Sequence, residues 1–257
     1  MPEPTAPARE PLTRDRIFAA ALEIIDAEGL AALSMRRLGS SLGVEAMAIY
    51  HHVPNKDTLL AGVGDTLLAP GATLPEGIGW REGLHWSADT LRTTLKAHPA
   101  AVPLVMDSPL RTEASVLWME GPLALLTDAG FAAPDAVGLF HGTLALLFGW
   151  VTFEGSSLRH AEPSAAIPTE LAAMAPTSAA LSGPVGDWSD GFDAALDALL
   201  DSWARRLPPG SKGAALATKS SRPTGGSAWI VEKGGVAGKS HKKDKPAKKK
   251  GKGKKKG

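Results

Sequence analysis

The stretch LSMRRLGSSLGVEAMAIYHHVPNKDTL, residues 33–59, contains the pattern that decides the fold. Its apolar residues recur at helical intervals on both sides of a glycine: Met35, Leu38 and Leu42, then Val44, Ile49 and Val53. Gly43 stands where helices often end in a conformation that favours glycine, while Ser34 and Asn55 are typical helix caps. The stretch therefore predicts a helix-turn-helix followed by a third, capped helix, an arrangement that suits DNA binding.

The same periodicity predicts helices along most of the remaining chain. The expected helices are 13–28, 55–68, 80–97, 101–106, 112–129, 135–154 and 188–207, with a short one around 170–174. Because no segment alternates at period two for long, a sheet is not expected. The predicted fold is all-α, with an N-terminal three-helix helix-turn-helix domain and a C-terminal helical ligand-binding and dimerisation domain.

The segment LSMRRLGSSLGVEAMAIYHHVPNKDTLL resembles the DNA-binding signature of TetR-type transcriptional regulators, and the upstream TRDRIFAAALEIIDAEGLAAL is similar to that family's first helix. The resemblance covers about the first 60 residues. It implies a DNA-binding domain at 13–60 and a helical ligand-binding and dimerisation domain at 61–210. Residues 1–12, with four prolines, are expected to form a flexible arm. A Lys-rich tail at 211–257 is not part of the family pattern and is expected to be disordered.

The family's DNA contacts carry over to side chains of the signature. The candidate DNA-binding residues are Ser34, Met35, Arg36, Arg37, Ala46, Met47, Ala48, Tyr50, His51 and Lys56. Ala46, Met47 and Ala48 would face base edges without donating hydrogen bonds, so Arg36 is the first choice for reading a guanine. Arg37 is equally well explained as a solvated surface charge. Residues 12–60 hold five basic and six acidic side chains, so bulk charge does not argue for DNA binding.

The C-terminal domain is expected to take a small-molecule effector and to form a homodimer. The candidate ligand-binding residues are His85, Trp86, Trp118, His141, Phe148 and Trp150, although each is individually more typical of a core. In the family, two late helices pair with their copies in a second subunit, and the apolar stripes of 135–154 and 188–207 fit that role. Taken without the resemblance, such stripes favour intrachain packing. No pattern for the metal and tetracycline pocket of the founding protein is present.

Composition excludes several classes of function. The chain lacks cysteine, and no HExxH motif occurs, so no catalytic, metal or cofactor site is expected. The sequence GGVAGKS, residues 234–240, ends like a phosphate-binding loop but has one residue too few. With no apolar run of membrane-spanning length, the chain is expected to be cytoplasmic, with no membrane partner.

The near-neutral total charge of +1 hides a strong asymmetry. Residues 1–210 hold 13 basic and 25 acidic side chains, a net of −12, whereas 211–257 hold 15 and 2, a net of +13. The tail could tether the protein to DNA through counterion release, or fold back on the acidic body.

The resulting interpretation is a ligand-responsive repressor that binds a near-palindromic operator as a homodimer. The rivals are a helical small-molecule-binding enzyme and a nonspecific DNA-coating protein driven by the tail. The operator, the regulated genes and the effector do not follow from the sequence.

Overall fold

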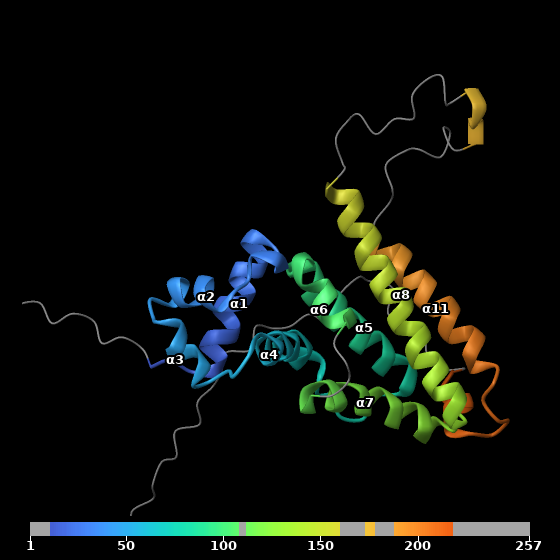
Figure 1. Ribbon diagram of the computed structural model, residues 1–257. Coiled ribbons are helices and arrows are strands. Elements are labelled where there is room, and N and C mark those ends of the chain that lie inside the picture. Colours follow the sequence, from blue (N-terminus) through green and yellow to red (C-terminus); the bar gives the residue numbers. More distant parts are fainter. Residues whose placement is uncertain (1–10, 108–111, 160–172, 178–187, 218–257) are drawn as a thin grey trace, which may run out of the picture. The chain divides into compact units, whose positions relative to one another are not determined.

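The computed structural model describes residues 11–107, 112–159, 173–177 and 188–217 (Figure 1). Every regular element in these residues is helical, which confirms the predicted all-α class. The α-helices are α1 (Arg14–Glu28), α2 (Met35–Leu42), α3 (Ala46–Tyr50), α4 (Lys56–Leu68), α5 (Trp80–Ala97), α6 (Val102–Asp107), α7 (Glu113–Ala129), α8 (Ala133–Arg159), α11 (Trp188–Ala204) and α12 (Lys212–Ala217). Three short 3₁₀ turns join some of them: η1 (Leu30–Ala32), η2 (Ala69–Gly71) and η3 (Pro99–Ala101).

The N-terminal core forms where the sequence places its apolar residues. α1 begins after Thr13, whose hydroxyl accepts a hydrogen bond from the Arg16 amide at 3.2 Å. α2 and α4 begin in the same way after Ser34 and Asn55. The apolar faces of these helices meet in one buried cluster that includes Ile17, Ile25, Leu38, Ile49, Val53 and Leu59. Packing therefore fixes α1 to α4 around a common core.

Two glycines shape the turn between α2 and α3. Gly43 ends α2 in the left-handed region, at φ 67° and ψ 34°, and the amide of Val44 donates to the Gly39 carbonyl at 3.0 Å. A Cβ on Gly39 would lie 2.8 Å from the Val44 carbonyl oxygen and 3.3 Å from the Ala46 nitrogen. Only a glycine at position 39 allows the start of α3 to lie this close to α2.

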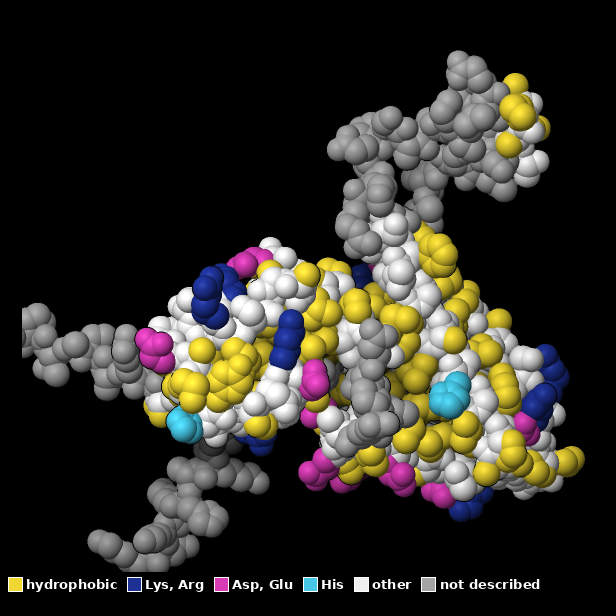
Figure 2. Space-filling model, viewed as in Figure 1, with side chains coloured by type: hydrophobic (Ala, Val, Ile, Leu, Met, Phe, Trp, Pro, Cys, Tyr) yellow, Lys and Arg dark blue, Asp and Glu magenta, His cyan; other side chains and the backbone are white. Residues whose placement is uncertain are grey.

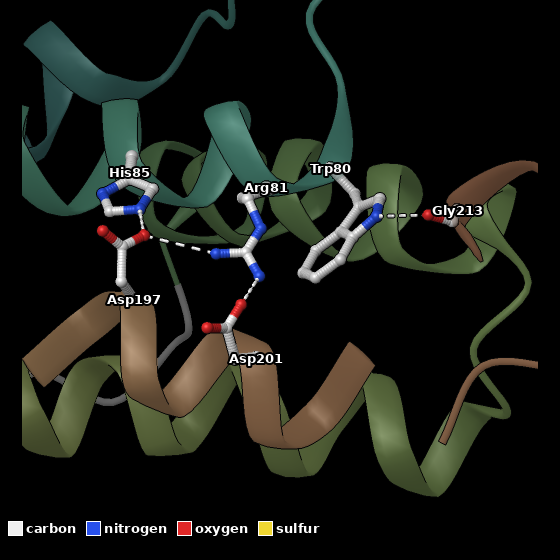
Figure 3. A network of polar contacts seen from close by, with 6 residues as sticks. All are labelled: Trp80, Arg81, His85, Asp197, Asp201 and Gly213. Atoms are coloured by element: carbon white, nitrogen blue, oxygen red, sulfur yellow. Dashed lines mark hydrogen bonds and ion pairs between the residues drawn. The ribbon is translucent and has the colours of Figure 1, made fainter. Parts of the chain in front are cut away.

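A second cluster of buried residues forms the core of the C-terminal helices. It joins α5, α7, α8 and α11 through large side chains, among them Trp80, Leu91, Trp118, Leu139, Phe140 and Phe192. α5 packs against α7 and α8, and α11 packs along α8 (Figure 1). α5 therefore has neighbours on several sides, and its polar face lies against α11 through the contacts of Arg81 and His85 (Figure 3).

The two cores do not separate cleanly near residue 60. Ala101 of η3 and Leu104 of α6 are buried in the N-terminal cluster, although the sequence assigned both to the C-terminal domain. His98, just before η3, also pairs with Asp26 of α1, with 2.7 Å between Nδ1 and Oδ2. The segment after α5 thus completes the core that supports the helix-turn-helix.

α8 is longer than the sequence predicted. It begins before Pro134 and runs beyond Glu154 to Arg159. A proline is tolerated in the first turn because the amides there have no intrahelical partner. By length and hydropathy, Ala133–Ser156 also meets the criteria for a membrane span. Helices in the core of a soluble protein often meet the same criteria. Only 33% of its most apolar window is buried within the chain, so an apolar face remains exposed.

The first residues of the Lys-rich tail form a helix, although the sequence predicted disorder from residue 211 onward. α12 occupies Lys212–Ala217, and the Gly213 carbonyl accepts a hydrogen bond from Trp80 Nε1 at 3.4 Å (Figure 3). A Cβ on Gly213 would lie 2.8 Å from Ala129, which shows how tightly α12 packs on α7. Residues 218–257, with the GGVAGKS segment, lie outside the described residues, as do residues 1–10 and most of the short helix expected around 170–174.

The Gly39→Ala substitution tests the turn. We expect it to lower the free energy of unfolding by about 1–3 kcal/mol, because the new methyl group meets backbone atoms that cannot rotate away. Urea denaturation followed by circular dichroism measures the change.

Gly64→Ala is the matched control, since nothing lies within 4 Å of a Cβ at this position inside α4. It should stabilise the protein by up to about 1 kcal/mol through helix propensity. Equal effects of the two substitutions would contradict the packing assigned to Gly39.

Candidate functional site

The side chains of α3 divide between the core and the surface. Ile49 is fully buried, whereas Met47 is 66% exposed and Tyr50 is 42% exposed. Ala46 and Ala48 are half-buried, so neither is enclosed in the core. Hydrophobic side chains gather on the surface over this helix (Figure 2). α3 therefore rests on the core through one residue and presents its other side to the outside.

The two arginines of α2 have different surroundings. Arg36 is exposed, and no ion pair involves its guanidinium among the residues that the structure describes. Arg37 pairs with Glu28 at the end of α1: its Nε lies 3.0 Å from Oε1, and its Nη2 donates to the same oxygen. Arg37 thus joins α1 to α2, while Arg36 remains available to a partner outside the chain.

The ion pair also shifts the pKa values of its two members. The hydrogen bond between Arg37 and Glu28 lowers the pKa of Glu28 below the ordinary value of 4.5 and raises the pKa of Arg37. Both groups are therefore charged at neutral pH. Because the Glu28 pKa is depressed in the folded state, the contribution of the pair is complete above that ordinary value and is lost as the pH falls through the lowered pKa.

Three other candidates have roles inside the chain. Met35 is only 9% exposed and belongs to the N-terminal core, because helical periodicity turns it inward with Leu38. Lys56 donates from Nζ to the Leu33 carbonyl at 2.8 Å. The Ser34 hydroxyl accepts a hydrogen bond from the Arg37 amide at 3.1 Å, although the Ser34 side chain is exposed. His51, the remaining candidate, is also exposed.

The six candidate effector residues do not share one set of contacts. Trp118 is buried, and its ring centroid lies 5.8 Å from that of Phe140, which lies 5.9 Å from that of the exposed His141. Trp150 donates to the Trp188 carbonyl at 2.9 Å. His85 pairs with Asp197 of α11, whereas Trp86 and Phe148 are half-buried.

Among the described residues, Trp118 Nε1 is buried without a hydrogen-bond partner. Phe140 beside it was not among the candidates. The polar residues between α5 and α11 were not among the candidates either, although their four-residue spacing is visible in the sequence: Arg81, His85 and Asp89 lie opposite Asp193, Asp197 and Asp201.

Two family models match the chain. Residues 17–63 match the model described as "Bacterial regulatory proteins, tetR family". Residues 73–205 match the model described as "Tetracyclin repressor-like, C-terminal domain". The matched ranges include the helix-turn-helix and almost all of the C-terminal helical core.

Two relatives differ in how much of their length is matched. An HTH-type transcriptional regulator from Saccharopolyspora erythraea is 31% identical over 212 residues, which are 79% of this chain and 89% of the relative. The HTH-type transcriptional repressor DrrR1 from Streptomyces coeruleorubidus is 36% identical over 137 residues, 51% of this chain. The matched part spans only half the length of DrrR1.

A solved structure extends the similarity to the fold. The TetR family protein ActR of Streptomyces coelicolor, in complex with actinorhodin, superposes with a TM-score of 0.61 at 28% identity. The superposition covers 76% of this chain and 98% of ActR. Both family models, the relatives and the ActR structure point to the same family. The chain belongs to the TetR family of DNA-binding transcriptional regulators.

Proposed function

We propose that this protein is a repressor that binds a near-palindromic operator as a homodimer and is released by a small molecule. The observation that carries the proposal is α3, which presents Met47 and Tyr50 outward over a buried Ile49. A short helix with an exposed face, held firmly by its other side, fits the major groove of DNA.

The side chains of α3 suggest how a sequence would be read. Met47 and the half-buried Ala46 and Ala48 supply apolar contacts, which suit thymine methyl groups and groove shape. Arg36 supplies the fork of donors that recognises guanine, whereas Arg37 is committed to Glu28. Ser34, Tyr50 and His51 are exposed beside them and suit phosphate oxygens, which fix register without reading bases. Lys56 could join them only by leaving the Leu33 carbonyl.

The exposed face of α8 supports dimerisation. Val137, His141, Ala145 and Thr152 of this helix are exposed along one stripe, and Phe153 beside them is 70% exposed. On α11, which packs along α8, Ala194 and Ala198 are exposed and small enough for a second helix to come close. Four such helices, two from each subunit, would bury an apolar surface that is otherwise in water. A two-fold dimer also suits an operator with two half-sites.

An effector would act by changing the spacing of the two DNA-binding domains. The similar protein ActR has been solved in complex with a small molecule, actinorhodin. Here the buried Trp118 Nε1 offers one donor to an aromatic ligand with an acceptor group. A route to the DNA-binding domain exists, because Ala101 and Leu104 follow α5 and pack in the N-terminal core. An effector that prefers the incompetent spacing would release the DNA.

The proposal places the protein in the cytoplasm and assigns no catalytic step to it. The Lys-rich segment after α12 would add affinity for any DNA through counterion release. A DNA-coating protein would differ in showing little preference among sequences, whereas the proposed repressor should favour its operator by roughly 4 kcal/mol or more over bulk DNA.

Arg36→Ala tests the reading of bases. We expect it to remove about 1–3 kcal/mol of discrimination at one base pair of each half-site, because the fork of donors to guanine is lost. Fluorescence anisotropy on the preferred duplex and its single-base variants measures the loss.

Two further variants separate base reading from simple charge. Arg36→Lys keeps the charge but not the fork, so it should fail to restore discrimination. Arg37→Ala, one position along, should leave discrimination intact. Full recovery with lysine would mean that Arg36 contacts a phosphate.

Ala145→Glu tests the dimer. A carboxylate in the middle of the α8 face would have to be buried between subunits, so we expect monomers in analytical ultracentrifugation and loss of operator binding. Ala124→Glu makes the same change at an exposed position of α7 and should remain dimeric. A dimeric Ala145→Glu protein would exclude this face as the interface.

A truncation after residue 217 tests the tail without removing α12. Operator choice should be retained, while affinity for random duplexes falls and varies less steeply with salt. Titrations at several salt concentrations measure both effects. An unchanged salt slope would favour a tail that interacts with the acidic body instead.

A further inference from the structure

Ionisable side chains at four-residue spacing line the contact between α5 and α11. Arg81 of α5 contacts two residues of α11: its Nη1 lies 3.2 Å from Asp197 Oδ1, and its Nη2 donates to Asp201 (Figure 3). One turn further along α5, His85 Nε2 lies 2.8 Å from the same Asp197 oxygen. The helices are antiparallel, so the next turn brings Asp89 of α5 near Asp193 of α11.

The two ring nitrogens of His85 differ: Nε2 contacts Asp197, whereas Nδ1 is buried without a partner among the described residues. Its side chain is 12% exposed, and the Asp197 oxygen that it contacts also accepts a hydrogen bond from Arg81. The second nitrogen, Nδ1, has no accessible surface and no hydrogen-bond partner within the described part of the chain. Figure 3 shows Nδ1 turned away from both Asp197 and Arg81. A buried polar atom of this kind is costly unless something binds to it.

The groups nearest to His85 are suited to a metal ion. One ring nitrogen of His85 and one carboxylate oxygen from each of Asp89 and Asp193 lie within 4.8 Å of one another. In a tetrahedral zinc site, with bonds near 2.1 Å, neighbouring ligand atoms are about 3.4 Å apart. Small rotations of two partly buried aspartates would close this difference.

We propose that His85, Asp89 and Asp193 bind a divalent transition-metal ion that bridges α5 and α11. The three residues supply one imidazole nitrogen and two carboxylate oxygens, a set that suits zinc and its neighbours, with water completing the coordination. Asp197 accepts the hydrogen of Nε2, which leaves the Nδ1 lone pair for the metal. This carboxylate, histidine and metal arrangement recurs around protein metal sites.

The charges along the same contact favour a cation. Asp89, Asp193 and Asp197 are three carboxylates within two turns of helix. The nearby arginines are already engaged: Arg81 with Asp197 and Asp201, and Arg92 with Glu154, at 2.9 Å from Nη2 to Oε2, and with Ser189. A divalent ion between Asp89 and Asp193 would attract both carboxylates.

The site is independent of the proposed repressor function and needs no drug molecule. It also has a structural consequence, since a metal there would tie α11 to α5, which leads directly through η3 into the N-terminal core. Metal binding itself, and not DNA binding, is therefore the quantity to measure.

The full-length protein, stripped with chelator and exchanged into chelator-free buffer, is titrated with Zn²⁺ alone by calorimetry. We expect one strong site per chain, together with a raised melting temperature, because the metal binds the folded state. Co²⁺ should give visible absorption bands from a site containing nitrogen and oxygen ligands. Mg²⁺ should bind much more weakly, since it prefers oxygen ligands and keeps its waters.

Variants decide whether that site is the one proposed. His85→Gln and Asp193→Asn should each weaken Zn²⁺ binding at least tenfold, and Asp197→Asn should weaken it by roughly 10–100-fold through the second ring nitrogen. His98→Gln is the matched control, because it removes another histidine paired with an aspartate, Asp26, and should bind as the wild type does.

Circular dichroism in the presence of chelator checks that every variant folds. If His85→Gln does not fold, Zn²⁺ binding by Asp193→Asn decides the outcome, because Asp193 is partly exposed. The proposal is overturned if the wild type binds no Zn²⁺. It is equally overturned if Asp193→Asn binds the ion as tightly as the wild type, which would place the metal at other histidines.

Discussion

The close approach of α3 to α2 is the constraint on which the DNA-binding surface depends. It requires a glycine at position 39, where a side chain would meet the backbone of Val44 and Ala46, and a left-handed residue at Gly43. Ile49 then enters the core, which turns Met47 and Tyr50 outward. Without this turn, α3 would have too few residues to remain helical by itself, since one short turn of helix gains little from its own hydrogen bonds.

The support of that surface extends beyond the helix-turn-helix. Leu104 and Ala101 are buried in the N-terminal core, and Asp26 of α1 pairs with His98 at the end of α5. A displacement of α5 by a bound molecule would therefore change the packing beneath α1 and α4. In a dimer joined through α8 and α11, such a change would alter the distance between the two copies of α3, and this gives the effector a physical way to control DNA binding.

Local signals were sufficient to predict the helices, because caps and apolar periodicity agree at Thr13, Ser34, Gly43 and Asn55. Features that depend on tertiary contacts were missed. Met35 faces the core although its neighbour Arg36 faces outward, Arg37 is committed to a glutamate nine residues earlier, and α12 is ordered because Gly213 packs against Ala129 and Trp80. The grouping of His85, Asp89 and Asp193 likewise requires two helices more than a hundred residues apart to be brought together.

Selection of duplexes from a random library by the full-length protein, followed by sequencing and native mass spectrometry of the bound species, tests the central claim most directly. The account predicts enrichment of an inverted repeat whose half-sites lie about one helical turn apart, with an even number of protein chains on each duplex. Enrichment of no sequence, or of a single half-site bound by one chain, would contradict it.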